Sequence, residues 1–342
     1  MSLEAAVAGV ALIAMITYAV LAGADFGGGV WDLFASGPRR DDQRAAIAKA
    51  MGPVWEANHV WLVFVIVLLF SGFPIAFNAL SIGLFVPFHL VLLGIILRGA
   101  AFVFRSYSLR AASLQVQQVF TRRWGYVFGV ASVITPLLLG MCLGAVSSGN
   151  LRVISGQVRF EGGIPWLAPI SLVIAALALA LCAYLAATYL ILETSGALRE
   201  DFRRRALYAG TAVVALAVLM LPLLAVEAPH LLGDLFQPRA WPVLAIGVVS
   251  ALVSGWALWQ RRFQLARVSA VIQIVALLGG WGLAQYPYII YPDITLTNSA
   301  ASQGTLAFLM ISLPFGLALL IPSLYLLFRV FKAGTLEPER GR

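Results

Sequence analysis

Hydrophobic residues occur along this chain in long runs separated by short polar stretches. Nine runs reach about 20 residues, the length of helix that crosses the roughly 30 Å hydrocarbon core of a bilayer. They cover approximately residues 4–24, 54–73, 76–102, 124–146, 166–192, 207–227, 241–259, 267–286 and 304–330. Each run predicts a membrane-spanning helix. The third and ninth are long enough to tilt or kink, and Pro314 and Pro322 favour a kink in the ninth.

The composition supports a membrane protein. Of the 342 residues, 61% are hydrophobic and only 11% are charged, whereas soluble domains average about 25% charged residues. This balance excludes an ordinary soluble enzyme, a secreted disulfide scaffold and a disordered chain. No stretch is polar enough for a separate soluble domain, so residues 1–342 are expected to form a single all-α membrane domain. Cys142 and Cys182 lie inside apolar runs and are expected to be core residues.

Basic residues alternate between the two sides of the predicted spans. Of the 23 lysines and arginines, all except Arg152, Arg159 and Arg239 fall on one side. The positive-inside rule therefore places the amino terminus outside and the carboxyl terminus in the cytoplasm. The net charge of +8 is explained by topology and does not indicate a nucleic-acid site. The first residues lack the positive segment of a signal peptide, so the first run is expected to be retained as a span.

Asp25 lies at the expected inner end of the first span. It follows Glu4 by 21 residues, which corresponds to about 31 Å of helix. A run of three glycines follows at 27–29 and predicts that the helix stops there. In one interpretation Asp25 is a turn residue beside that stop. In the other it binds a proton or a partner, because a carboxylate at a helix carboxyl end meets the negative end of the dipole.

Glu56 lies at the expected inner start of the second span, in the sequence GPVWEANHVW. Pro53 suits a first helical turn, so Glu56 could simply complement the positive end of the helix dipole. However, it stands between two tryptophans directly before an apolar run, and His59 follows one turn deeper with Trp61 nearby. An ionisable pair placed this way favours the start of a proton path. Asp25 and Glu56 are expected to converge on the cytoplasmic side.

The remaining ionisable residues in or beside the spans have simpler interpretations. Arg98 is expected to snorkel to the inner interface. Asp32 and Glu193 are expected at the inner edge of the membrane, and Glu227 at the outer edge. His89 lies in mid-helix and could ligate a haem, but a lone histidine there is more typical of a hydrogen-bonded core residue. The sequence contains no nucleotide-binding, haem c or zinc-binding motif.

Three blocks of sequence carry a resemblance to a known family. They are GADFGGGV at 23–30, GPVWEANHVW at 52–61, and an outer segment with YPY at 286–288 and PDIT at 292–295, followed by AAS at 300–302. The prolines of the last block exclude a continuous helix there, and its tyrosines are typical of an interfacial aromatic belt. With these blocks, the length and the nine spans, the chain resembles subunit II of cytochrome bd-type quinol oxidases, including the cyanide-insensitive branch.

The resemblance implies two four-helix bundles plus one peripheral helix, in the bacterial inner membrane. It implies a heterodimer with subunit I, surrounded by membrane lipids, to which small single-helix subunits can be added. In the family, subunit I holds the b-type and d-type haems and takes ubiquinol or menaquinol, and oxygen is reduced to water without proton pumping. Subunit II is implied to support assembly and to lend a cytoplasmic proton path. That role falls on Glu56 and Asp25, with Trp61 lining the path and His59 beside it.

The resemblance has limits, and it leaves alternatives open. Ala57 stands where many relatives have glycine, and Thr297 stands where tryptophan is expected. The family has no fixed haem ligand at the positions of His59 or His89, so no cofactor ligand is expected in this chain. One alternative is a proton-coupled secondary transporter, which would be favoured by paired broken helices at the membrane midplane. Another is a structural scaffold with no proton role.

Overall fold

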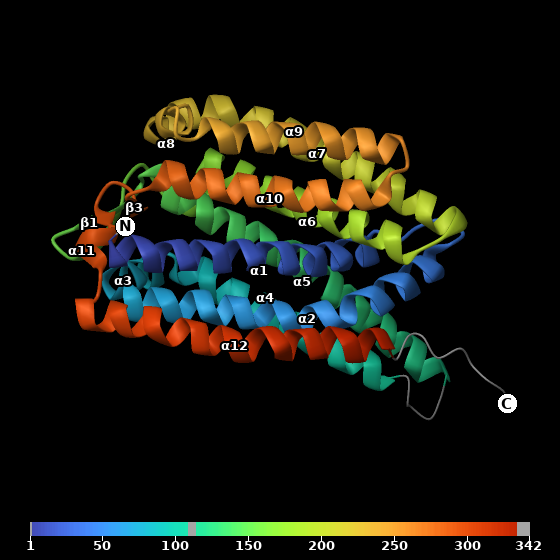
Figure 1. The fold of residues 1–342 in the computed structure, drawn as a ribbon. Coiled ribbons are helices and arrows are strands. Elements are labelled where there is room, and N and C mark those ends of the chain that lie inside the picture. The colour runs from blue at the N-terminus through green and yellow to red at the C-terminus, as the bar shows by residue number, and fades with distance from the viewer. Residues whose placement is uncertain (1, 109–113, 334–342) are drawn as a thin grey trace.

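The computed structural model describes residues 2–108 and 114–333, with side chains except those at 51–56, 105–121, 327–328 and 330–333. Long helices run side by side along one axis, and short elements cover one end (Figure 1). The helices are α1 (Leu3–Leu33), α2 (Arg40–Gly72), α3 (Pro74–Gly83), α4 (Phe85–Ser108), α5 (Leu114–Ser148), α6 (Pro169–Glu193), α7 (Gly196–Glu227), α8 (Pro229–Leu235), α9 (Trp241–Trp259), α10 (Phe263–Gln285), α11 (Leu296–Ser299) and α12 (Gln303–Ala333).

The long helices form two groups of four. Helices α1, α2, α4 and α5 pack together, and α6, α7, α9 and α10 form the second group. The groups meet where α1 and α5 lie against α6, and α12 lies at the periphery beside α2 and α1 (Figure 1). This arrangement is the predicted pair of four-helix bundles with one additional helix.

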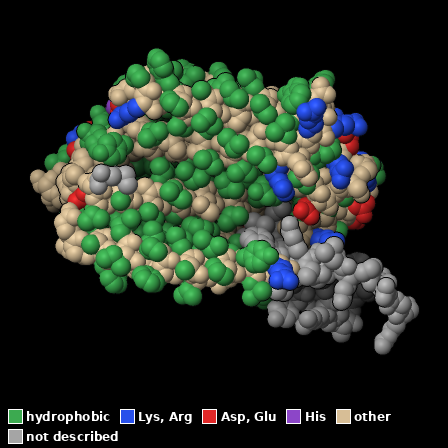
Figure 2. Space-filling model, in the orientation of Figure 1, with side chains coloured by type: hydrophobic (Ala, Val, Ile, Leu, Met, Phe, Trp, Pro, Cys, Tyr) green, Lys and Arg blue, Asp and Glu red, His purple; other side chains and the backbone are tan. Residues whose placement is uncertain are grey.

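The surface is that of a membrane protein. Apolar side chains cover the length of the face seen in Figure 2, and charged side chains gather toward its two ends. In the described part of the chain, eight helices are long and apolar enough to cross a membrane. The end of α2 (Ala57–Gly72) with α3 supplies a ninth span if this bent pair is counted as one.

The third predicted span is not continuous. The prediction placed one helix over 76–102, but α3 stops at Gly83 and α4 begins at Phe85. The bend of 118° between the end of α2 and α3 lies at the predicted boundary between the second and third spans. Pro74 begins α3, and because proline has no backbone N–H it cannot continue the hydrogen-bond ladder of α2. Leu84 interrupts the helix a second time. The short helix remains packed in the core through Ala76, Ala79 and Leu80.

The glycine run in α1 has a different role from the predicted helix stop. The helix continues through it to Leu33. A Cβ on Gly27 would lie 1.9 Å from the carbonyl oxygen of Cys182 in α6, and one on Gly29 would lie 2.1 Å from Oγ of Ser132 in α5. These glycines are therefore required for close helix packing, as small residues are in many membrane proteins.

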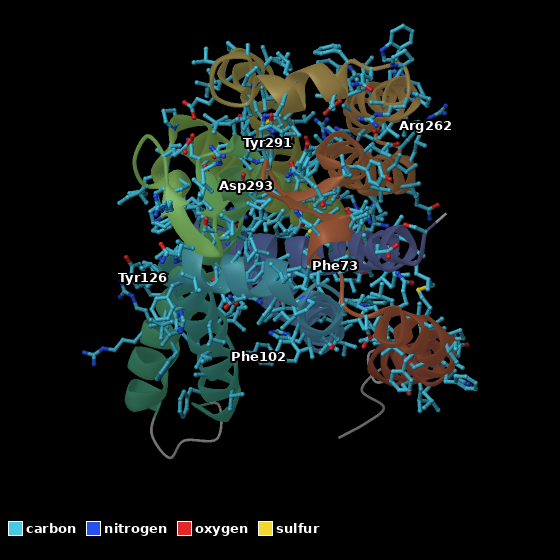
Figure 3. All side chains as sticks on the ribbon, turned by 90° about the vertical axis from the view of Figure 1, so that its left-hand side faces the viewer. Phe73, Phe102, Tyr126, Arg262, Tyr291 and Asp293 are labelled. Carbon is cyan, nitrogen blue, oxygen red and sulfur yellow. The ribbon has the colours of Figure 1, made fainter. Side chains whose placement is uncertain are left out.

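Short strands and turns form the end shared by the start of α1 and the end of α10. Strands β1 (Leu151–Ile154) and β2 (Gln157–Phe160) pair antiparallel across a two-residue turn whose Ser155 and Gly156 both have positive φ. Strands β3 (Tyr288–Ile290) and β4 (Ile294–Thr295) form a second pair, and Pro287 and Pro292 follow cis peptide bonds. A 3-10 turn (Pro165–Leu167) precedes α6. Figure 3 looks onto this end. As predicted, no helix continues past Gln285 into this segment.

Candidate functional site

Asp25 and Arg98 form a buried ion pair between α1 and α4. Their side chains are only 1% and 2% exposed. Arg98 Nη1 contacts Asp25 Oδ2, and Arg98 Nη2 donates to Asp25 Oδ1 at 2.5 Å and to the Asp25 carbonyl oxygen at 2.9 Å. The contact is a two-pronged guanidinium–carboxylate pair, the strongest geometry available to these groups.

Helices α2 and α5 complete this network. Asn58 Nδ2 on α2 donates to Asp25 Oδ2 at 2.8 Å. Arg98 Nε donates to Ser132 Oγ on α5 at 2.8 Å, and that hydroxyl donates to the Phe128 carbonyl oxygen at 2.7 Å. All four helices of the first bundle therefore meet at one buried polar site.

Aromatic rings surround the charge of Arg98. The central carbon of its guanidinium lies 4.8 Å from the ring centroid of Phe26 and 4.7 Å from that of Phe128. Both are within cation–π range. The prediction that Arg98 snorkels to the interface is therefore wrong. Its side chain stays inside the bundle because Asp25 supplies a compensating charge there.

Asp25 acts only as an acceptor in this network. Its carboxylate receives hydrogen bonds from both terminal nitrogens of Arg98 and from the amide of Asn58. Burying two charges is costly, and the cost is offset only when they are paired and their remaining hydrogen-bonding capacity is used. The arrangement provides a fixed, compensated negative charge in the interior of the first bundle.

Trp61 lies beside this site with an unused hydrogen-bond donor. It packs against Tyr18, Ala22 and Phe26 of α1, with its ring edge-to-face to Phe64. Its indole Nε1 is buried and has no partner among the described groups. Buried donors of this kind are commonly satisfied by ordered water. An ordered water bound at this N–H would satisfy the donor.

The other two predicted residues lie on the same helix as Trp61. His59 is half-buried on α2, next to Asn58. Glu56 is also on α2, but its side chain lies outside the described residues. The structure thus brings Asp25 together with Asn58, the residue before His59. The predicted convergence of Asp25 with Glu56 stays a prediction.

Three further acidic residues occupy the ends of helices or the interior nearby. Asp32 is buried near the end of α1, where Arg44 Nε lies 3.9 Å from Oδ1 and donates to the backbone oxygen at 3.3 Å. Glu193 is the last residue of α6. Glu227 is the last residue of α7, and its Oε2 accepts a hydrogen bond from the backbone N–H of Ile170 in the first turn of α6.

The histidines do not combine into a haem site. His89 Nδ1 is hydrogen-bonded to the Phe85 carbonyl at 2.7 Å, but the residue lies on the exposed face of α4 and not in a core as predicted. His230 stacks on Tyr291 with ring centroids 3.4 Å apart. These two and His59 lie on three different helices, and the described residues contain no group of three or more His, Cys, Asp or Glu placed to hold a metal.

Sequence reasoning missed three members of the network: Arg98 as an ion-pair partner, Asn58 and Ser132. A signal for the pair existed, because Asp25 and Arg98 are opposite charges that both adjoin long apolar runs. Isolated opposite charges in membrane helices commonly pair with one another. Ser132 gave no signal, since a serine in a membrane helix is common and usually bonds its own backbone.

Comparisons with known proteins agree with this architecture. The sequence model of the family described as cytochrome bd terminal oxidase subunit II matches residues 3–331. The chain is 24% identical over 327 residues to a Bacillus subtilis protein whose name marks it as a candidate subunit II of a cytochrome bd menaquinol oxidase, covering 92% of this chain and 91% of that one. It is also 24% identical to subunit 2 of the cytochrome bd-I ubiquinol oxidase of Escherichia coli, over 85% of this chain and 82% of the relative.

A solved structure gives the same result. The bd oxidase from Geobacillus thermodenitrificans contains a chain that matches with a TM-score of 0.81 and 25% sequence identity, covering 97% of this chain and 99% of that chain. The family match favours an oxidase subunit over a transporter, and the predicted resemblance is confirmed. With its two helical bundles and its full-length match, this chain belongs to the cytochrome bd terminal oxidase subunit II family.

Proposed function

We propose that this chain pairs with a haem-bearing subunit I, stabilises the assembled oxidase, and provides a path for proton uptake from the cytoplasm along α1 and α2. The observation that carries the proposal is the buried Asp25–Arg98 pair next to Trp61 and its unpartnered indole N–H. Ionisable groups inside a membrane protein are costly and usually mark ion or proton routes. The haems are assigned to subunit I in this proposal, and the three histidines of this chain lie on three different helices.

The proposed path begins at Glu56 and continues along α2 past His59 toward Trp61. Successive positions three or four residues apart lie on one face of a helix, which places Glu56 and His59 one turn apart. A water held by the Trp61 indole would extend the chain of hydrogen bonds beyond them. Glu56 is the group that exchanges protons in this proposal.

Asp25 has a different role in the path from that of Glu56. Its carboxylate accepts hydrogen bonds from Arg98 and Asn58, which hold it in place. It therefore contributes a fixed charge that orients neighbouring dipoles and water, while Arg98 prevents a net negative charge from being buried.

The reduction of oxygen by the complex requires a supply of protons. The haems of the oxidase supply the oxygen chemistry when bound, in which electrons from quinol and an equal number of protons convert oxygen to water. If the protons come from the cytoplasm and the quinol releases its protons outside, charge separates across the membrane without pumping. This chain's contribution is to admit and hold protons on the cytoplasmic side.

The test is Glu56→Gln in the complex purified through a tag on this chain. We expect quinol-driven oxygen consumption to fall at least about tenfold, because a positioned proton-transfer group is removed. The reduced-minus-oxidised haem spectrum should stay unchanged, and Glu56→Asp should recover part of the turnover. Glu193→Gln, at an exposed acid that ends α6 and lies outside the proposed path, is the control and should be neutral.

Two results would contradict the proposal. Normal turnover in Glu56→Gln with an intact spectrum would leave this chain as a scaffold. Loss of the haem spectrum in both Glu56→Gln and Glu56→Asp would assign Glu56 to assembly instead of proton transfer.

A further inference from the structure

A basic hollow lies at the end of the bundle opposite the strand pairs. It forms where the connection between α1 and α2 meets the first turns of α7, and its volume is about 260 Å³. The lining residues are Ser36, Gly37, Pro38, Arg39, Gln43, Asp201, Arg204 and Arg205. Three guanidinium groups and one carboxylate give the hollow a net positive charge.

Arg205 is held in place on one wall of this hollow. Its guanidinium lies over the rings of Trp31 and Phe202, 5.2 and 5.4 Å from their centroids. Its Nη2 donates to Gln43 Oε1 at 2.6 Å, and Gln43 Nε2 donates in turn to Asp201 at 3.2 Å. The positive charge of Arg205 is thus fixed in position before any ligand arrives, which lowers the entropic cost of binding.

The other two arginines of the hollow, Arg39 and Arg204, differ in how closely they are paired with a carboxylate. Arg39 makes a two-pronged contact with Asp201, with Nε and Nη2 donating at 2.8 and 2.6 Å. The side chain of Arg204 is 68% exposed, and its nearest acidic oxygen, on Glu200, is 3.9 Å away. Arg204 is therefore the weakly committed charge at the rim, free to contact an anion.

An apolar strip leads away from Arg204 along the outside of α7. Tyr208, Thr211, Ala215 and Val218 follow Arg204 at helical spacing on the same face, and all four are exposed. Tyr208 and Val218 are large enough to contact a lipid chain, and tyrosine is enriched at membrane interfaces. A ligand with an anionic head and an apolar tail would match both the hollow and the strip.

We propose that this hollow binds the phosphate group of an anionic phospholipid, with an acyl chain lying over the strip that begins at Tyr208. Guanidinium groups match phosphate oxygens in charge and geometry. The site lies where the apolar flank of the protein gives way to charged side chains (Figure 2), which is the level of lipid head groups. A free inorganic phosphate would use the arginines but not the apolar strip.

The experiment compares Arg204→Gln with Arg261→Gln in the intact complex. Arg261 is a matched control because its side chain is also 68% exposed and also lies near Glu200, at 3.6 Å, but it does not line the hollow. Short-chain phosphatidylglycerol is titrated into detergent-solubilised complex, with phosphatidylcholine and inorganic phosphate as separate probes. Binding is followed by native mass spectrometry and by the shift in melting temperature.

We expect phosphatidylglycerol to bind the wild type and Arg261→Gln equally, and Arg204→Gln about fivefold more weakly. Tyr208→Ser should also weaken the binding of phosphatidylglycerol, although it leaves all three arginines of the hollow in place. Equal loss in both arginine variants, or equal binding of phosphatidylcholine, would overturn the proposal in favour of general surface charge. Inorganic phosphate that matches the lipid in affinity would overturn it in favour of a free-anion site.

Discussion

Two arginine–aspartate pairs, each a two-pronged contact, occupy opposite settings in this protein. Arg98 and Asp25 meet in the interior of the first bundle. Arg152 and Asp293 meet at the end that carries the strands, where Nε and Nη2 donate at 2.8 and 3.1 Å and the side chains are 26% and 18% exposed. Asp293 is labelled in Figure 3, and Glu161 is a second carboxylate beside Arg152. We call the buried Arg98–Asp25 pair the inner pair and the partly exposed Arg152–Asp293 pair the outer pair.

The difference shows that environment, more than geometry, decides what an ion pair does. Water can solvate either partner of the outer pair, so its main effect is local. Asp293 also accepts a hydrogen bond from the Val153 backbone N–H, which ties β1 to the connection between β3 and β4. The side chains of the inner pair are almost completely buried, so bulk solvent cannot replace a lost partner and each charge depends on the other.

The largest effect is expected from Arg98→Met. This change leaves the Asp25 carboxylate buried without its counter-charge, and breaking a buried pair costs about 3–5 kcal/mol. We expect little assembled complex in the membrane and a markedly lower melting temperature. The double variant Arg98→Met with Asp25→Leu removes both charges and should recover most of the stability. A double variant no better than the single one would show that packing, and not charge, holds this site.

A smaller loss is expected from Gly29→Ala, which attacks the inner network without removing a charge. The added methyl would lie 2.1 Å from Ser132 Oγ, the group that accepts the Arg98 Nε hydrogen bond. Overpacking of this kind costs about 1–3 kcal/mol. Gly9→Ala on the same helix is the control, because its Cβ would meet nothing within 4 Å. Thermal unfolding of the two purified variants should separate them clearly, and similar curves would contradict the packing argument.

The smallest effect is expected from Asp293→Asn at the outer pair. Partly exposed ion pairs contribute about 0–1 kcal/mol, so global unfolding should barely change. The rate of hydrogen exchange at β1 should rise, because the charged carboxylate that accepts the Val153 N–H hydrogen bond is replaced by a neutral amide. High salt should reduce the difference in β1 protection between wild type and Asp293→Asn, since exposed ion pairs are screened by salt. A collapse of the whole complex in this variant would remove the proposed contrast with the inner pair.

The outer pair also predicts a pH dependence. The hydrogen bond from Arg152 holds the pKa of Asp293 below its usual value. A carboxylate whose pKa is lower in the folded state contributes stability above its unfolded pKa, near 3.9. That contribution is lost as pH falls through the lower folded pKa. The protection of β1 in wild type relative to Asp293→Asn should therefore be constant above about pH 4 and disappear at more acidic pH.

The pattern of apolar runs was enough to predict the helical membrane architecture, but local backbone geometry modified it. The two-bundle arrangement and the irregular end after Gln285 are confirmed. The third span was predicted as one helix because α3 and α4 together form one long apolar run, and hydropathy does not register the break at Leu84. The turn at Pro74 falls between the predicted second and third spans. Likewise, the glycines at 27–29 looked like a helix stop because their packing partners lie in α5 and α6.

The candidate site was also predictable only in part. Asp25 could be singled out from the sequence because an acid beside a long apolar run is costly wherever the chain folds. Its partner could not be assigned, because Arg98 is 73 residues away and Ser132 is a further 34, and only the packing of α1, α4 and α5 brings them together. Hydropathy is a property of neighbouring residues and determines the solvent in which each segment is stable. Which buried charge meets which depends on how the helices pack against one another, so only the tertiary structure decided it.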